Sequence, residues 1–227
     1  TLVEQILSSH PKVFGADEID YIPDLIKKNF GGNDLRLFFD GMVDFEEKTL
    51  KEIGKDYVQK IKSISNNSER ITDKLPINFK WIGFIRLIFP DSKIIHCKRN
   101  ALDTCLSIFQ QNFLTNGNEF TFNILEIGKY YNLYLDSILH WKKTLQNDFF
   151  EVEYENFIVN QKSETKRLLT YCALEWEEQC LDFHLTKRYV RTSSDAQVRK
   201  KIYFSAVNKW KLYKKHLKEL RSVLNLK

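Results

Sequence analysis

The sequence contains no hydrophobic run that approaches the roughly 20 residues needed to span a bilayer, which argues against an integral membrane protein. It also lacks any CxxC pair, and none of its four cysteines stands at metal-ligand spacing from a histidine. We therefore interpret Cys97, Cys105, Cys172 and Cys180 as buried free thiols of a reducing compartment. The five histidines form neither an HExxH motif nor a triad-like spacing, so we assign them structural or surface positions.

The chain also lacks an initiating methionine and a signal peptide, and it opens directly with TLVEQILSSHP. Apolar residues at positions 2, 3, 6 and 7 share one helical face, and Thr1 and Glu4 have the spacing of a capping box. The pattern predicts a helix over 2–9 that begins at Thr1, and we expect the segment before this helix to be missing. The absence of a signal peptide and of a membrane span favours the cytoplasm.

Neither sign of charge is in large excess, because 35 Lys and Arg residues stand against 30 Asp and Glu residues. The net charge of +5 fits an anionic ligand or simply a solvated surface, and it is too small to predict a nucleic-acid-binding patch. The 227 residues are enough for one sizeable core, and no linker, repeat or low-complexity tract divides them. We therefore predict a single domain over residues 1–227.

Apolar patterning predicts strands that alternate with helices along the chain. We expect strands near 13–14, 70–76, 92–99 and 148–155. We expect helices over 46–64, 78–89, 101–113, 121–145, 161–173 and 205–223. This alternation is typical of an α/β protein with a parallel sheet.

The stretch CKRNALDTCLSIF places Arg99 at the end of a predicted strand and Ser107 eight residues later, in the following helix. Ligands bind at the carboxyl ends of parallel strands, where helix N-termini offer unpaired N–H groups to an anion. Arg99 and Ser107 are therefore candidates for holding a phosphate. The alternative is that Arg99 pairs with a carboxylate such as Asp103 while Ser107 only occupies a helix position.

Other polar residues follow the neighbouring strands. Lys74 closes the second strand, Glu18 lies in the loop after the first, and Tyr154 ends the strand near 150. Glu18 is a candidate general base, although acidic loops and lysines at strand ends are commonly just solvated. The long loop over 191–203 is basic and rich in hydroxyl groups, which favours phosphate capture.

Several ordered segments resemble the sulfotransferase superfamily, specifically the bacterial sulfotransferase domains that follow tetratricopeptide repeats and the tyrosylprotein sulfotransferases. TLVEQILSSHPKVFGADEI is similar to the end of the P-R-S-G-T-T-L phosphosulfate loop and the helix after it. ITDKLPINFKWIGFIRLIFPDSKIIHCKRNALDTCLSIF resembles the central block, and VEYENFI, LEWEEQCLDFH and SSDAQVRKKIYFSAVNKW resemble the C-terminal half. The resemblance implies a P-loop-NTPase-like three-layer sandwich with a central parallel sheet. It also implies that the chain begins within the phosphosulfate loop, whose earlier part is absent.

The resemblance further implies that the donor is 3′-phosphoadenosine 5′-phosphosulfate (PAPS), which is converted to PAP without a metal. It implies that Arg99 and Ser107 bind the 3′-phosphate and that Thr1 contacts the 5′-phosphate. Tyr154 matches a tyrosine near the cofactor, and Ser194 and Lys209 match residues that complete the phosphosulfate cradle.

For the transfer step, Glu18 matches the base that takes the acceptor proton, and Lys74 matches a lysine that stabilises the leaving phosphate oxygen. Ser194 is expected to assist Lys74 there.

The implied acceptor carries a hydroxyl or amine on a carbohydrate, lipid or peptide. Gln111 stands where the tyrosylprotein enzymes carry a further arginine for the 3′-phosphate. Asp20 and Asp24 stand where those enzymes carry arginines that face an acidic acceptor peptide, which argues against such an acceptor here. We also expect a homodimer and a preceding tetratricopeptide-repeat region. Two alternatives stay open: an inactive nucleotide-binding or scaffolding domain, and a P-loop kinase. The kinase would need a GxxxxGK[ST] motif and a Mg²⁺-binding acid, neither of which is visible.

Overall fold

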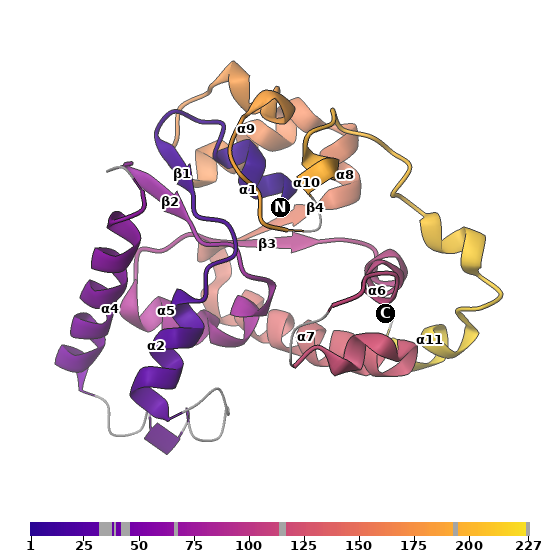
Figure 1. The fold of residues 1–227 in the computed structure, drawn as a ribbon, viewed down its shortest axis with the longest axis horizontal. Helices are drawn as coiled ribbons and strands as arrows, with labels where there is room; N and C mark the ends of the chain where they lie inside the picture. Colours follow the sequence, from indigo (N-terminus) through magenta and orange to yellow (C-terminus); the bar gives the residue numbers. More distant parts are fainter. Residues whose placement is uncertain are drawn as a thin grey trace. The chain divides into compact units, whose positions relative to one another are not determined.

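The computed structural model describes residues 1–31, 38, 40–41, 46–65, 68–113, 117–192 and 195–225. The chain forms two compact units (Figure 1). Unit 1 contains Thr1–Lys93 and Leu169–Lys201, and unit 2 contains Ile94–Leu168 and Ile202–Lys227. The prediction of a single domain stays a prediction.

Unit 1 is built around a short parallel pair of strands. β1 (Val13–Gly15) and β2 (Arg70–Thr72) pair in parallel, with Val13 opposite Arg70 and Gly15 opposite Thr72. The helices that lie wholly in this unit are α1 (Leu2–Leu7), α2 (Tyr21–Phe30), α4 (Glu47–Lys62), α5 (Ile82–Ile88) and α10 (Asp195–Val198). Its 3₁₀ turns are η1 (Pro76–Trp81), η4 (Glu178–Cys180) and η5 (Phe183–Leu185).

Unit 2 repeats this arrangement with longer strands. β3 (Ile94–Lys98) and β4 (Phe149–Glu153) are parallel, with Ile94 opposite Phe149 and Lys98 opposite Glu153. Its α-helices are α6 (Ala101–Phe109), α7 (Ile124–Leu145), α8 (Tyr154–Val159) and α11 (Lys218–Val223). Its 3₁₀ turns are η2 (Glu119–Phe122), η3 (Gln146–Asp148) and η6 (Lys209–Tyr213). Helix α9 (Gln161–Tyr171) begins in unit 2 and ends in unit 1.

The predicted α/β alternation and the parallel pairing are confirmed, but several element predictions are wrong. The strand predicted over 70–76 ends at Thr72, so Lys74 lies beyond it, and residues 78–81 of the helix predicted over 78–89 belong to η1.

The helix predicted over 205–223 is interrupted, because Asn208 adopts a left-handed φ of 59° between irregular chain and η6. The carboxylate of Asp103 accepts the N–H groups of Asn208 and Trp210 and so fixes this break. Tyr154 begins α8 rather than ending a strand.

The predicted capping box at the N-terminus is also wrong. Thr1 makes no side-chain cap on α1, and the Glu4 carboxylate turns into unit 1 instead. There its Oε1 accepts the Asp17 N–H at 2.8 Å and the Thr72 hydroxyl at 3.0 Å, and its Oε2 lies 3.2 Å from Arg188. Glu4 therefore joins α1 to both strands.

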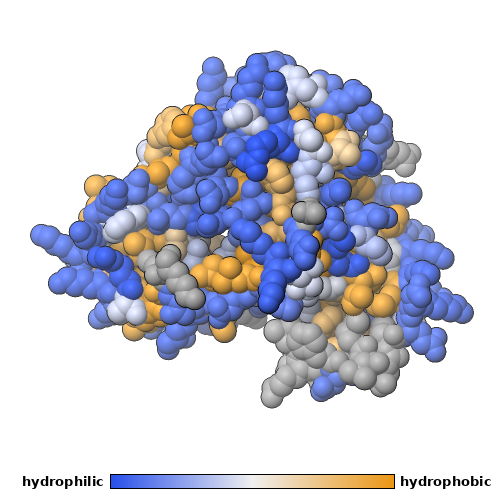
Figure 2. All heavy atoms as spheres, turned by 180° about the vertical axis from the view of Figure 1, so that it is seen from behind, coloured by the Kyte–Doolittle hydropathy of each residue, from blue (hydrophilic) through white to orange (hydrophobic). Residues whose placement is uncertain are grey.

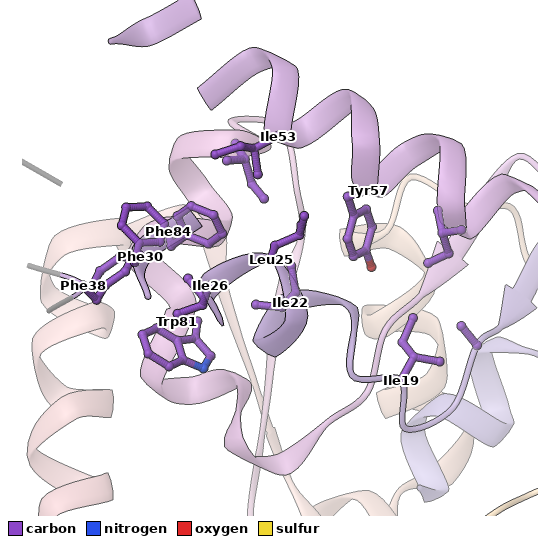
Figure 3. Packing of buried hydrophobic residues seen from close by; sticks show 13 residues of the cluster. Ile19, Ile22, Leu25, Ile26, Phe30, Phe38, Ile53, Tyr57, Trp81 and Phe84 are labelled. Carbon is purple, nitrogen blue, oxygen red and sulfur yellow. The ribbon is translucent and has the colours of Figure 1, made fainter. Parts of the chain in front are cut away.

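The core of unit 1 fixes the loop that follows β1. Figure 3 shows Ile22, Ile26 and Phe30 from α2, together with Ile53 and Tyr57 from α4, gathered around this core. Phe84 is 2% exposed and meets the Phe30 ring edge-to-face at 5.8 Å. Ala16 and Ile19 belong to the same cluster, so Asp17 and Glu18 stand between two anchored residues.

The core of unit 2 fixes helix α6 in a similar way. Ala101, Leu102, Cys105 and Leu106 of α6 pack with Ile127 and with the C-terminal leucines at 217, 220 and 224. One face of α6 is therefore buried, and Ser107 lies half-buried beside it.

All four cysteines are free thiols, as predicted, but only Cys105 and Cys180 are buried, and Cys97 is exposed near the end of β3. Within the described ranges, no helix combines the length and apolarity needed to cross a bilayer. The face in Figure 2 is dominated by hydrophilic side chains, with hydrophobic residues in separate areas.

Replacement of Phe84 by Ala should destabilise the protein by about 3–5 kcal/mol, because it leaves a cavity among the rings of unit 1. The matched control is Leu87→Ala on the same helix, since Leu87 is 52% exposed and should change stability by only about 0.5 kcal/mol. Chemical denaturation of both variants measures the difference, and equal losses would contradict the assigned core.

Candidate active site

The carboxyl ends of β1 and β2 bring three charged side chains together in unit 1. Asp17 and Glu18 follow β1, and Lys74 follows β2 by two residues. The Lys74 Nζ lies 2.5 Å from Glu18 Oε1 and 3.2 Å from Asp17 Oδ1. The Lys74 backbone N–H also donates to the Asp17 carbonyl at 3.1 Å. Parallel pairing thus joins residues more than 50 positions apart.

The two carboxylates of this cluster differ in how accessible they are. The Glu18 side chain is 33% exposed and that of Lys74 is 21% exposed, whereas the Asp17 side chain is only 5% exposed. Neither Glu18 nor Lys74 is therefore a simply solvated surface charge. Glu18 is therefore the more accessible of the two carboxylates.

Asp17 is held in place by several donors, and sequence reasoning gave it no role. Burial raises the pKa of Asp17, but the Arg191 N–H, Lys74 and Arg188 outweigh burial and leave this pKa below its usual value. The Arg191 N–H reaches Asp17 Oδ2 at 2.6 Å. Asp17 also has a φ of 62°, a left-handed conformation that Asp tolerates better than most residues.

The segment 186–192, here called the strap, is tied to the same edge. Arg188 donates to the Gly15 carbonyl at 3.1 Å, and the Thr1 hydroxyl lies 3.2 Å from that of Thr192. Arg199 donates to the carbonyls of Thr186 and Arg188, both at 2.5 Å. The loop arginines 188 and 199 thus hold protein groups in this structure. Ser194 lies outside the described residues.

Asp73, next to Lys74, is a second residue that the sequence did not single out. Its carboxylate accepts the Tyr57 hydroxyl at 2.8 Å and the Asn78 side-chain amide at 3.1 Å. Burial, with smaller contributions from Glu4 and Asp20, raises the pKa of Asp73 to about 6, although both hydrogen bonds oppose this rise. Asp73 connects the backbone beside Lys74 to α4 and η1.

The carboxyl ends of β3 and β4 form the corresponding edge of unit 2. Arg99 follows β3, and its guanidinium lies 5.3 Å from the centre of the Tyr154 ring, which follows β4. The Arg99 NH2 donates to the Ala206 carbonyl at 2.7 Å, while its Nε is buried without a hydrogen-bond partner. The alternative pairing of Arg99 with Asp103 is wrong, because Asp103 accepts the N–H groups of Asn208 and Trp210.

The start of α6 differs from the expectation of unpaired N–H groups. The Asn100 side chain caps this helix by accepting the N–H groups of Leu102 and Asp103. The Asn100 N–H itself donates to Glu155. The predicted anion site at this helix therefore depends on side chains more than on the first-turn backbone.

Ser107 lies on α6, and Lys209 begins η6, which packs beside α6. The Ser107 hydroxyl has no hydrogen-bond partner within the described part of the chain, and no hydrogen bond joins it to Arg99. Lys209 is exposed and donates to the Gln110 side chain at 3.0 Å. An unpartnered guanidinium nitrogen and an available hydroxyl fit a phosphate ligand. Among the described residues, no group of three His, Cys, Asp or Glu side chains is placed to hold a metal.

Comparisons with known proteins give a consistent result. Residues 1–178 match the model of the sulfotransferase family. A protein of Aquifex aeolicus (strain VF5), described as uncharacterized, is 36% identical over 231 residues, which cover 99% of this chain and 30% of that protein. The chain thus spans about three tenths of the length of this curated relative.

A solved structure supports the fold. The sulfotransferase domain from the curacin biosynthetic pathway matches with a TM-score of 0.63 at 13% identity, covering 98% of this chain and 90% of that one. At this identity the match shows the fold, and it confirms the predicted fold class.

The raised pKa of Asp73 predicts a pH-dependent stability. Its pKa is about 6 in the folded protein against an ordinary value of 3.8, so the folded state holds the proton more tightly. The free energy of unfolding should therefore fall as pH rises from about 4 to about 6, relative to Asp73→Asn, by at most about 3 kcal/mol. Chemical denaturation of both proteins across this range measures the effect, and parallel pH curves would contradict it.

Proposed function

This chain belongs to the sulfotransferase family, and we propose that it transfers the sulfonate group of PAPS to a hydroxyl or amine of an acceptor. The observation that carries the proposal is the contact of Glu18 with Lys74 at the carboxyl edge of β1 and β2. It places an accessible carboxylate beside a cation, the two groups that sulfonate transfer requires. The buried, unpartnered Nε of Arg99 supports an anion site at the edge of unit 2.

For donor binding, we propose that Arg99 and Ser107 recognise the 3′-phosphate. A guanidinium can give a phosphate two parallel hydrogen bonds, and a serine hydroxyl can add a third. Lys209 supplies a further exposed cation in the same unit, and Tyr154 lies against the Arg99 guanidinium. Thr1 is assigned to the 5′-phosphate, and Ser194 to the phosphosulfate, by their matching positions in the family.

In the transfer step, Glu18 accepts the proton of the acceptor hydroxyl as the acceptor oxygen bonds to sulfur. PAPS supplies the sulfonate, and its bond between sulfur and the 5′-phosphate oxygen breaks to leave PAP. Lys74 stabilises the negative charge that develops on that leaving oxygen, and Ser194 assists it. No proton has to reach the leaving phosphate, because an ammonium beside it offsets its charge.

The acceptor class follows from charge near Glu18. Asp20 and Asp24 are exposed at the start of α2, and Asp24 pairs with Lys60 at 3.2 Å. Asp20, two residues after the base, adds a negative charge that disfavours an acidic peptide and so favours a hydroxyl of a carbohydrate, a lipid or a less acidic peptide. Homodimerisation, an adjoining repeat region and a cytoplasmic location are further proposals for the whole protein.

Calorimetric titration with PAP, and with AMP as the comparison, tests donor recognition. We expect PAP to bind much more tightly than AMP, because only PAP carries the 3′-phosphate. Arg99→Ala should weaken PAP binding by about 10- to 100-fold, since it removes hydrogen bonds to a charged group. Lys98→Ala is the matched control, because Lys98 is exposed and pairs with Glu153. Equal affinity for PAP and AMP would contradict the assignment of a 3′-phosphate site.

Glu18→Gln tests the base. We expect turnover to fall by about 10²–10⁴-fold while affinity for PAP stays near that of the wild type, because Gln keeps the shape but cannot take a proton. Asp91→Asn, an exposed acid of the same unit with no assigned role, should leave turnover unchanged. Transfer of labelled sulfonate from PAPS to acceptor mixtures gives the rates, and an unchanged rate in Glu18→Gln would remove Glu18 from the mechanism.

A further inference from the structure

The Lys74 ammonium is shared by two carboxylates that are held in different ways. Glu18 makes the directed hydrogen bond at 2.5 Å. Asp17 Oδ1 lies 3.2 Å from the same nitrogen but receives no well-directed hydrogen bond, so its contact with Lys74 is mainly electrostatic. Glu18 is partly exposed, whereas Asp17 is buried.

Asp17 is fixed from several directions. Its N–H donates to Glu4 Oε1 at 2.8 Å, its carbonyl accepts the Lys74 N–H at 3.1 Å, and its Oδ2 accepts the Arg191 N–H at 2.6 Å. The flanking residues Ala16 and Ile19 belong to the buried core. The left-handed backbone at Asp17, with a φ of 62°, is kept in place by this set of contacts.

We propose that Asp17 is a positioning residue that acts as the permanent counter-charge of Lys74 and couples Lys74 to the strap. This proposal rests on the proposed function for its catalytic consequence, whereas its structural part does not. During transfer Glu18 takes up the acceptor proton, and the resulting neutral carboxyl no longer balances the charge of Lys74. Asp17 stays in place, because its other oxygen and its backbone are engaged, so it keeps the ammonium at the strand edge.

The coupling follows from the two oxygens of one carboxylate. Oδ1 faces Lys74 and Oδ2 holds the strap at Arg191, so the loss of either partner changes the restraint on the other. Arg188 attaches the strap at a second point, because its side chain donates hydrogen bonds to Glu4 and to the Gly15 carbonyl. The buried carboxylates Asp17 and Glu4 and the cations Lys74 and Arg188 therefore form one connected group.

Asp17→Asn is the sharpest test, because Asn also tolerates the left-handed backbone and retains an oxygen for Arg191. We expect kcat to fall by about 10- to 100-fold from misplacement of Lys74, with the KM for PAPS and the affinity for PAP within about twofold of wild type. Asp91→Asn, an exposed acid of the same unit, is the control. A kcat of the Asp17→Asn variant equal to that of the wild type would contradict the proposed role of Asp17 in positioning Lys74.

Amide hydrogen exchange tests the coupling without donor or activity. The Arg191 amide should exchange faster in Asp17→Asn and also in Lys74→Met. Lys74 is far from the strap in sequence, and within the described ranges no hydrogen bond joins the two. Lys74→Met keeps the coupling testable even where Asp17→Asn folds poorly. Unchanged exchange in Lys74→Met overturns the coupling.

A double-mutant comparison separates positioning from an independent effect. If Asp17 acts through Lys74, Asp17→Asn combined with Lys74→Met should lose no more turnover than Lys74→Met alone. If the losses of turnover in the two single variants add up in the double variant, Asp17 does not act through Lys74. A wild-type protein that transfers no sulfonate would contradict the proposed function, and the exchange measurements would still decide the coupling.

Discussion

The contact between the Lys74 ammonium and the carboxylates of Asp17 and Glu18 is the interaction on which the account of unit 1 depends. It exists because β1 and β2 run parallel and end at the same edge, so residues from two distant loops meet there. A buried carboxylate is costly unless charges and hydrogen bonds offset the loss of water. Asp17 meets this condition through Lys74 and Arg191, and Glu4 meets it through Arg188, Thr72 and the Asp17 N–H. The core beneath, with Ala16 and Ile19 in place, fixes the backbone that carries both acids.

In unit 2, as in unit 1, two parallel strands end at one edge, but different side chains meet there. Parallel pairing of β3 with β4 places Arg99 and Tyr154 at one edge, and among the described residues no carboxylate forms an ion pair with the Arg99 guanidinium. Asp103, which is the nearest acid in the following helix, is fully engaged with the backbone of residues 208 and 210. A cation with an unpartnered nitrogen is suited to an external anion, whereas the partly exposed carboxylate of Glu18 in unit 1 is the type of group that can accept a proton. This contrast supports a division between nucleotide recognition and chemistry.

The order of strands and helices, the parallel pairing and the edge positions of Glu18, Lys74 and Arg99 could be predicted from the sequence, because strand alternation and short connections are local signals. The ends of β2 and β4 could not, since β2 ends at Thr72 and Tyr154 begins α8. The partners of the edge residues could not be predicted either, because they are set by tertiary contacts. Glu4 has the spacing of a capping box, yet three groups from other elements attract its carboxylate more strongly than the end of α1 does. The helix predicted after residue 205 is interrupted where the carboxylate of Asp103, about 100 residues earlier, accepts the backbone N–H groups of Asn208 and Trp210. The role of Asp17 depends on Arg191, 174 residues away, and no local pattern carries that information.

The central claim is that a 3′-phosphorylated adenine nucleotide is the ligand of this protein. A crystal structure of the protein with PAP tests it most directly. The account predicts the 3′-phosphate within hydrogen-bonding distance of the Arg99 guanidinium and the Ser107 hydroxyl, with Arg99 Nε no longer unpartnered. A bound nucleotide whose 3′-phosphate contacts neither residue would contradict it.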